Sequence, residues 1–292
     1  MTSSQDQSPI PVVNGLQYQI LITSSLSIVI PTIFVAIRIF AKLSKTTKPL
    51  DLANAGILLN LAVCTGLHMN YFVLVCKGGM GFHTAEIVSR FGPSVLVVFG
   101  KTIVSVGVLY NLAMYTCKIP VLLMYATLMP VPRILLLVRC CGVLLTLSYL
   151  STAIAPFFLC RPLAYNWDKT IEAGLCGNWP LYYTFCGALN IVYEVIVLLL
   201  PMPFIMKLQL PLRRRLILVG MFGVGFATCA IGIYRQITIP GLDFNEMPHD
   251  SIGATVFSGL GPPVAISLSC VPFLRLLFAN RYNSTHKKIN DD

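Results

Sequence analysis

The segment Leu181–Arg215 constrains the fold of this chain more than any other part of the sequence. It is apolar for about 25 residues, enough for a helix to cross the hydrocarbon core of a bilayer, which is about 30 Å thick. Tyr183, Gly187, Asn190 and Glu194 recur at a spacing that places them along one face of this helix. A carboxylate in a membrane span costs about 2.5–3.5 kcal/mol, so Glu194 should face protein or a water-filled cavity. The segment therefore predicts a polytopic membrane protein with a polar interior.

The end of this segment and the overall composition support the same prediction. Pro201 and Pro203 end the span, and the basic residues Lys207 and Arg213–Arg215 follow. The chain is 56% hydrophobic and only 11% charged, whereas a soluble domain has about 25% charged residues. The net charge of +10 lies mostly in short segments between apolar runs. We therefore expect a lipid bilayer, and no nucleic acid, as the partner of this charge.

The remaining apolar runs extend this prediction to an all-α fold, a seven-transmembrane helix bundle. Within a bundle at 18–279, we expect spans at 18–41, 52–75, 102–129, 134–159, 179–205, 216–239 and 251–278. Residues 1–17 are expected to form an extracytoplasmic tail, and residues 280–292 a cytosolic tail. The apolar run Pro93–Gly100 is too short to cross the bilayer, and we interpret it as an outer extension of the third helix.

The loops divide their basic residues unevenly between the two sides of the expected bundle. One side contains Lys42, Lys45, Lys48, Arg133, Lys207, Arg213, Arg214, Arg215, Arg281, Lys287 and Lys288. The other side contains Lys77, Arg90, Lys101, Arg161 and Lys169. Because basic residues concentrate in cytosolic loops, we expect the N-terminus outside or in a lumen and the C-terminus in the cytosol. We therefore expect an integral protein of the plasma membrane or an endomembrane. The glycosylation sequon at Asn283 would then lie in the cytosol and should stay unmodified.

Two polar stripes on separate spans predict a polar cavity inside the membrane. Asn111, Tyr115 and Lys118 share one face of the third span, as Asn190 and Glu194 do in the fifth. Lys118 and Glu194 lie at matching depth from the cytosolic ends of their spans, so pairing them would relieve both desolvation penalties. The pair fits two roles equally well. It is either a ligand contact or switch, or a static lock between two helices.

Two further features lie toward the non-cytosolic side. Cys160 and Cys176 bracket the loop between the fourth and fifth spans, where disulfides persist. We expect a bond between them, and the alternatives are two free thiols or a bond to Cys76. Arg235 lies near the outer end of the sixth span, and we expect its side chain to reach the membrane interface rather than bind a ligand.

Other function classes lack the residues that they need. A retinal-binding rhodopsin requires a lysine in its seventh helix, and residues 251–279 contain none. The sequence has no GxSxG motif for a hydrolase. A cyclase would use several acids around one cavity, but Glu194 is the one acid well inside an expected span. His83 has no second ligand at metal spacing. We therefore expect no catalytic, cofactor-binding or metal-binding residues.

A series of short motifs resembles the fungal rhodopsin-like integral membrane family. They are Gly79-x-Gly81-x-His83, Lys118-Ile-Pro-Val-Leu-Leu-Met-Tyr125, Cys160-Arg161-Pro162 with Trp167, Gly174-x-Cys176, Asn190 and Glu194 before Leu200-Pro201-x-Pro203, Arg235, and Cys270-Val-Pro272-x-x-Arg275. The resemblance implies seven helices and receptor-like sensing of a small molecule or surface cue, passed to a cytosolic signalling partner. Members also occur in secondary-metabolite gene clusters. The alternative it implies is a membrane-embedded cyclase or accessory factor acting on an apolar small molecule.

The chain departs from that family at several polar positions. The family usually has Ser where Pro120 stands and Arg where Thr127 stands, and it has Trp and Glu where Phe257 and Gly261 align. A pair of acids before the second span is reduced to Asp51. These changes remove polar contacts that a receptor switch would use, so they bear on signalling more than on the fold.

Overall fold

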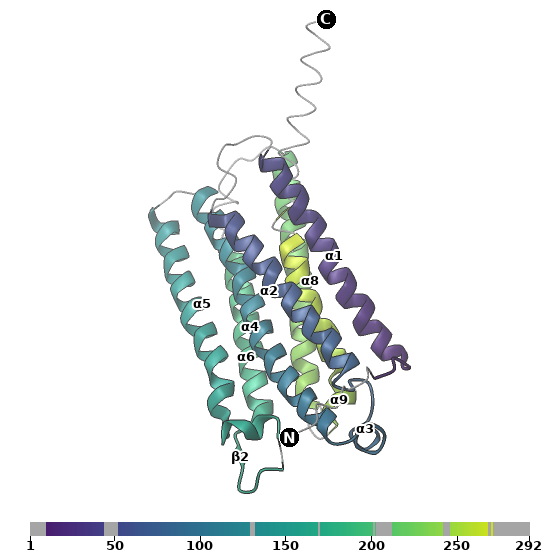
Figure 1. The fold of residues 1–292 in the computed structure, drawn as a ribbon. Helices are drawn as coiled ribbons and strands as arrows, with labels where there is room; N and C mark the ends of the chain where they lie inside the picture. The colour runs from purple at the N-terminus through teal and green to yellow at the C-terminus, as the bar shows by residue number, and fades with distance from the viewer. Residues whose placement is uncertain are drawn as a thin grey trace, which may run out of the picture.

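The computed structural model describes residues 10–43, 52–128, 132–168, 170–200, 212–241 and 246–267, together with Met202 and Cys270. Over these residues the chain is an all-α helical bundle (Figure 1). Its long helices are α1 (Gly15–Leu43), α2 (Leu52–Cys76), α4 (Ser94–Leu128), α5 (Pro132–Leu159), α6 (Trp179–Leu199) and α8 (Leu212–Thr238). A shorter apolar helix, Ile252–Ser267, lies among them.

Side chains on the outside of the bundle show that it is built for lipid. In the described part of the chain, α1, α2, α4, α5 and α6 are long and apolar enough to cross a membrane. Large apolar residues such as Phe40, Leu144 and Phe158 point outward and are more than half exposed. Such a surface would be costly in water, and it is the surface that a hydrocarbon core requires. The protein is therefore an integral membrane protein with several spans in the bilayer.

Helix α4 is the central element of the bundle. It packs against α2 on one side and against α5 and α6 on the other. Val106 and Ala113 join the apolar core shared with α2, whereas Met114 and Leu122 join a second core shared with α5 and α6. We expected this span at 102–129 with an outer extension over Pro93–Gly100, and the helical extension is confirmed, since the helix is 35 residues long and begins at Ser94. The run after Pro93 is therefore the first part of α4.

The connection between α2 and α4 contains a short helix, α3 (Thr84–Phe91), which lies between the expected second and third spans. The preceding glycines allow a tight turn: Gly81 has φ +105°, and a Cβ there would come within 2.7 Å of the Gln17 side chain. Gln17 in turn donates from Nε2 to the carbonyl of Met80 at 2.9 Å. This turn ties the start of α1 to the end of α2.

His83 completes that turn and joins it to a distant part of the chain. Its ring stacks on His249 with centroids 4.1 Å apart. His249 belongs to α9 (Met247–Asp250), which precedes the helix Ile252–Ser267. The carboxylate of Glu246 accepts the backbone N–H of Thr84 at 3.1 Å and lies 3.3 Å from His83 Nδ1. The Gly-x-Gly-x-His motif therefore forms one wall of a contact between the α2–α4 connection and the segment around α9.

The loop after α5 closes on itself at the end of the bundle that also holds α3 and α9 (Figure 1). Its strands β1 (Cys160–Arg161) and β2 (Leu175–Cys176) pair antiparallel, with Cys160 opposite Cys176, and a disulfide joins these two residues. Between the strands lie the 3-10 turn η1 (Leu163–Asn166) and Trp167. A second 3-10 turn, η2 (Ile239–Gly241), ends α8.

Several expected boundaries differ from the structure or lie beyond it. The fifth span was expected at 179–205, whereas α6 ends at Leu199, and residues 203–205 lie outside the described part. The seventh was expected at 251–278, and its helix is described only over Ile252–Ser267 and at Cys270. The tail at 280–292 with Asn283, the basic run at 44–51 and the first nine residues are also outside the described residues.

Candidate functional site

The ammonium group of Lys118 is the centre of a polar network inside the bundle. Lys118 is 3% exposed and lies on α4. Its Nζ is 3.0 Å from Glu194 Oε2 and donates to Asn190 Oδ1 at 2.9 Å, both on α6. It also lies 3.4 Å from the Tyr149 hydroxyl on α5 and 3.4 Å from the carbonyl of Met114. An ammonium has three N–H donors, so its capacity for hydrogen bonds is filled.

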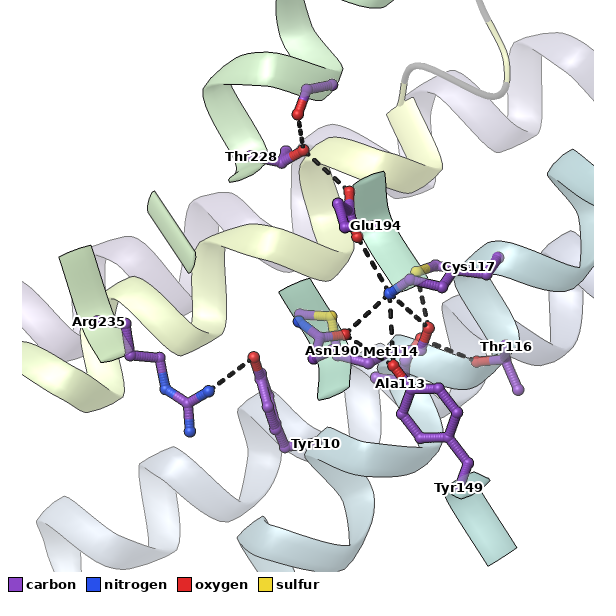
Figure 2. A network of polar contacts seen from close by, with 12 residues as sticks. Tyr110, Ala113, Met114, Thr116, Cys117, Tyr149, Asn190, Glu194, Thr228 and Arg235 are labelled. Atoms are coloured by element: carbon purple, nitrogen blue, oxygen red, sulfur yellow. Dashed lines mark hydrogen bonds and ion pairs between the residues drawn. The ribbon is translucent and has the colours of Figure 1, made fainter. Parts of the chain in front are cut away.

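The acidic partner extends the network to a fourth helix. Thr228 on α8 donates from Oγ1 to Glu194 Oε1 at 3.0 Å, while the other carboxylate oxygen faces Lys118. Tyr149 donates to Asn190 Oδ1 at 2.7 Å. Asn190 and Glu194 are four residues apart, so one turn of α6 aims both side chains at α4. Figure 2 shows Tyr149 from α5, Asn190 and Glu194 from α6, and Thr228 from α8 converging on this site.

This arrangement meets the conditions under which a buried ion pair is tolerated. Two charges removed from water are compensated only when they touch and when their remaining polar atoms are also bonded. Lys118 and Glu194 satisfy both conditions. The Glu194 side chain keeps 24% exposure, because it borders a small cavity of about 30 Å³, called here the inner cavity, together with Asn190 and Thr228. The network can therefore act as a charged element that joins four helices beside an internal space.

A larger cavity lies on the side of this network toward α9. It has a volume of about 90 Å³ and is called here the outer cavity. Its walls come from α4, α6, α8, α9 and the helix Ile252–Ser267, and they include Val106, Gly107, Tyr183, Met247 and Ser258. By the same measure one water molecule needs about 10–15 Å³. The outer cavity therefore has room for several waters or for part of a small molecule.

Arg235 and Tyr110 line both cavities and separate them. Arg235 donates from Nη1 to the Tyr110 hydroxyl at 3.0 Å, and its Cζ lies 4.5 Å from the centroid of the Tyr110 ring. Figure 2 shows this pair beside the cluster around Glu194. We expected Arg235 to reach the membrane interface, and this was wrong. The π face of Tyr110 holds the guanidinium inside the bundle, since a ring quadrupole attracts a cation.

The residues expected to form one polar cavity are not all together. Lys118, Asn190 and Glu194 meet in the network. Asn111 lines the outer cavity, and its amide donates to the carbonyl of Gly107 in its own helix at 2.9 Å. The Tyr115 hydroxyl lies 3.1 Å from Thr146 Oγ1 on α5, while its ring packs against the Tyr149 ring with centroids 5.7 Å apart. Tyr115 therefore borders the network through Tyr149, and its hydroxyl contacts Thr146 rather than Lys118.

Three members of the site were missed from the sequence. Tyr149 and Tyr110 each lie within an apolar run, where tyrosine is ordinary because most of its surface is apolar. The single hydroxyl proton of Thr228 has two acceptors within reach, Glu194 and the backbone carbonyl of Gly225, and the second is a local bond that any helical threonine can make. Their depth in the spans was the one available signal. In the described part of the chain, no group of three or more His, Cys, Asp or Glu residues is placed to hold a metal ion.

Comparison with known proteins identifies similar sequences. Residues 37–280 match the fungal rhodopsin domain. The chain is 28% identical over 229 residues to the polyenoic acids biosynthesis gene cluster protein Ba17b of Metarhizium anisopliae, covering 77% of this chain and 60% of that protein. It is 26% identical over 218 residues to a SAT4 family membrane protein of Emericella nidulans, covering 73% of this chain and 54% of that protein. The chain thus spans little more than half the length of these curated relatives.

Proposed function

This chain belongs to the fungal rhodopsin family, as its motifs indicated, and from that membership we propose a receptor-like function. The protein binds a small, largely apolar molecule in the outer cavity and responds through the charged network beneath it. The observation that carries the proposal is the position of Tyr110 and Arg235, which line the outer cavity and the inner cavity at once. An occupant of the outer cavity would therefore touch residues that also border Glu194.

The chemistry of the outer cavity supports binding of a small molecule. Ligand sites are concave and mostly apolar, with a few polar groups that fix orientation. Ile103, Val106, Ile239 and Met247 supply the apolar surface, and Arg235 supplies a charge. The network below joins α4, α5, α6 and α8. A ligand that moves one of these helices changes the distances in the network, and small helix shifts of this kind underlie many receptor switches.

We also propose that the bundle has seven spans, with α8 as the sixth and the helix beginning at Ile252 as the seventh. The N-terminus would then lie outside or in a lumen, and the C-terminus with a signalling partner would lie in the cytosol. Two observations support this orientation. The basic residues favour the C-terminal side, and the disulfide loop shares its end of the bundle with α3 and α9.

A glycosylation tag tests this orientation directly. Inserted after Glu172, within the disulfide-closed loop, the tag should be glycosylated, because this loop would face the lumen where the transferase acts. The same tag fused after Asp292 should remain unmodified. The measurement is the loss of apparent mass on gel after glycosidase treatment of isolated membranes. The reverse pattern, with a modified tag after Asp292, would contradict the proposed orientation.

Filling the outer cavity tests the proposed function. A Cβ added at Gly107 meets no atom within 4 Å, so the substitution Gly107→Leu should place its side chain in the cavity without displacing the backbone. Wild-type protein purified from a fungal host should carry a small molecule that native mass spectrometry detects. Gly107→Leu should reduce its occupancy by about tenfold, because the branched side chain takes up the space at the cavity wall.

A second glycine provides the matched control. Gly142 on α5 is also helical, has no atom within 4 Å of an added Cβ, and accepts a side-chain hydrogen bond from the residue four positions later. It lies outside the outer cavity. Gly142→Leu should therefore retain the bound molecule at the wild-type level. An equal loss in both variants would mean that the molecule does not occupy the outer cavity.

A role in a biosynthetic pathway is the second candidate function. One relative is a protein of a polyenoic acids biosynthesis gene cluster, which favours a membrane-embedded accessory factor that holds an apolar metabolite. A cyclase is less well supported, since Glu194 is bound by Lys118 and Thr228 and a proton-donating acid would need its proton free. Incubating wild-type membranes with the co-purified molecule separates the two functions. Chemical conversion of that molecule supports the biosynthetic role, and its unchanged release supports sensing.

A further inference from the structure

We propose that the outer cavity selects a small molecule with a carboxylate group, which binds between Arg235 and Tyr110 while its apolar part follows the cavity wall. This inference rests on the proposed function, because it names the chemical class that the same cavity takes. Four features of the cavity support it: the charge of Arg235, its incomplete hydrogen bonding, the state of the other polar groups, and the apolar wall.

The first feature is a cation that no described acid neutralises. Each acid in the described part of the chain has another partner or is exposed. The pairs are Glu194 with Lys118, Glu86 with Arg90, Glu246 with His83, Asp250 with His249 and Asp168 with Thr170, and Glu172 is exposed. Arg235 instead contacts Tyr110. A guanidinium held inside a membrane protein needs a counter-charge, and an anionic ligand would supply it.

The second feature is a buried donor without an acceptor. Within the described residues, Nε of Arg235 is buried and makes no hydrogen bond, whereas Nη1 donates to Tyr110. Nε and the adjacent Nη form the edge of the guanidinium that binds a carboxylate through two parallel hydrogen bonds. The Tyr110 oxygen accepts from Arg235, so the Tyr110 hydroxyl can donate its own proton to an oxygen of the ligand. One carboxylate would satisfy both side chains.

The third feature is that five other polar side chains of the cavity are already bonded. Ser251, Thr255 and Ser258 donate to backbone carbonyls of their own segment. Asn111 donates to the carbonyl of Gly107, and Tyr182 donates to the carbonyl of Thr152. These groups shape the cavity but do not require a ligand. Arg235, whose Nε is unpaired within the described residues, is therefore the lining group best placed to bind a charged head group, with Tyr110 beside it.

The fourth feature is the wall that an apolar chain would follow. Ile103, Val106, Ile239 and Met247 line the outer cavity between Arg235 and the α9 end. A cavity of about 90 Å³ suits a short chain attached to the head group. A ligand amine would meet the positive charge of Arg235 and be repelled. A neutral ester of the same length would keep the apolar contacts but lose its charge-assisted hydrogen bonds.

Hexanoate, methyl hexanoate and hexylamine are the probes that test this inference. Affinity for the full-length protein in lipid nanodiscs is measured from the rise of its unfolding temperature with probe concentration. Hexanoate should bind at least tenfold more tightly than the ester, and hexylamine should not bind. Arg235→Gln should weaken hexanoate by about 10- to 100-fold, the range expected for hydrogen bonds to a charged group. The same variant should weaken the ester less than it weakens hexanoate, since the neutral ester carbonyl accepts one hydrogen bond and not a charged, bidentate pair.

Two further variants keep the test decisive. Arg235→Lys retains the charge but loses the paired N–H geometry, so hexanoate should bind with intermediate affinity. Arg139→Gln removes an exposed arginine on α5 and should leave all affinities unchanged. If Arg235→Gln does not fold, Tyr110→Phe replaces it, with an expected loss of about tenfold, since the hydroxyl donates one hydrogen bond to a charged carboxylate.

The outcomes separate this inference from the proposed function. Equal affinity for hexanoate and its ester, with both reduced by Gly107→Leu, would overturn carboxylate selection and leave the cavity as a ligand site. If hexanoate binds both Arg235→Gln and Gly107→Leu with the wild-type affinity, it binds outside the outer cavity, and the inference is overturned. Absence of hexanoate binding would also overturn it, while the co-purified molecule still decides the proposed function.

Discussion

Lys118→Met is expected to lower the free energy of unfolding by about 3–5 kcal/mol, because it leaves the carboxylate of Glu194 without its cationic partner inside the bundle. The substitution also removes the hydrogen bond that Lys118 Nζ donates to Asn190 Oδ1 at 2.9 Å. Methionine matches the length of lysine closely enough that packing around α4 changes little. The measurement is thermal unfolding of the purified full chain in detergent micelles, followed by an environment-sensitive thiol dye.

A double-mutant cycle shows whether this loss comes from the pair. Glu194→Gln should cost less than Lys118→Met, since glutamine can still accept the hydrogen bond from Thr228. The reversed pair Lys118→Glu/Glu194→Lys should recover part of the stability, because Asn190 can turn its amide to donate instead of accept. Lys101→Met provides the control on α4, where Lys101 is exposed. In the matching double variant Lys118→Met/Glu194→Gln, a loss equal to the sum of the two single losses would show that Lys118 and Glu194 act independently.

Removing the disulfide is expected to produce the second large effect. Cys160→Ser should lower the free energy of unfolding by about 3 kcal/mol, the value that chain entropy assigns to a closed loop of about 15 residues. The separation between Cys160 and Cys176 is 16 residues. Because β1 and β2 hold these two residues opposite each other, the loop should also become more sensitive to proteolysis near Leu163 when the bond is absent. Thermal unfolding and timed protease digestion measure the two effects.

Cys140→Ser is the matched control, because Cys140 is an exposed free cysteine on α5. The unfolding temperature of Cys140→Ser should equal that of wild type. A reducing agent should lower the unfolding temperature of both proteins equally, and it should not lower that of Cys160→Ser. Mass spectrometry of non-reduced peptides should show Cys160 linked to Cys176. Complete alkylation of both cysteines in the folded protein would contradict the disulfide.

The spans were accessible from the sequence because their signal is long and one-dimensional. About 20 apolar residues are enough to identify a helix that crosses a bilayer, and α1, α2, α5 and α6 begin within three residues of their expected starts. α3 is different. With eight residues it spans little more than two turns, too short for a helical period to stand out, and the neighbouring Gly78–Gly81 turn signals favoured a loop.

The site was predictable only where depth along a span decides the contact. Lys118 and Glu194 share a depth, and the structure places their charged atoms 3.0 Å apart. The depth of a residue along its span does not determine how the helix is rotated about its own axis. That rotation is why Tyr149 joins the network while Tyr115, one turn from Lys118, reaches Thr146 instead. It also explains Arg235, whose inward direction depends on the Tyr110 ring on another helix.

The wall shared by the two cavities makes their behaviour reciprocal. Arg235 and Tyr110 border the outer cavity and also the inner cavity beside Glu194. If an occupant of the outer cavity changes the equilibrium of the ion pair by some factor, thermodynamic linkage requires the ion pair to change the occupant's affinity by the same factor. Lys118 does not line the outer cavity. Any change in ligand affinity caused by Lys118→Met would therefore measure the coupling free energy between the outer cavity and the ion pair.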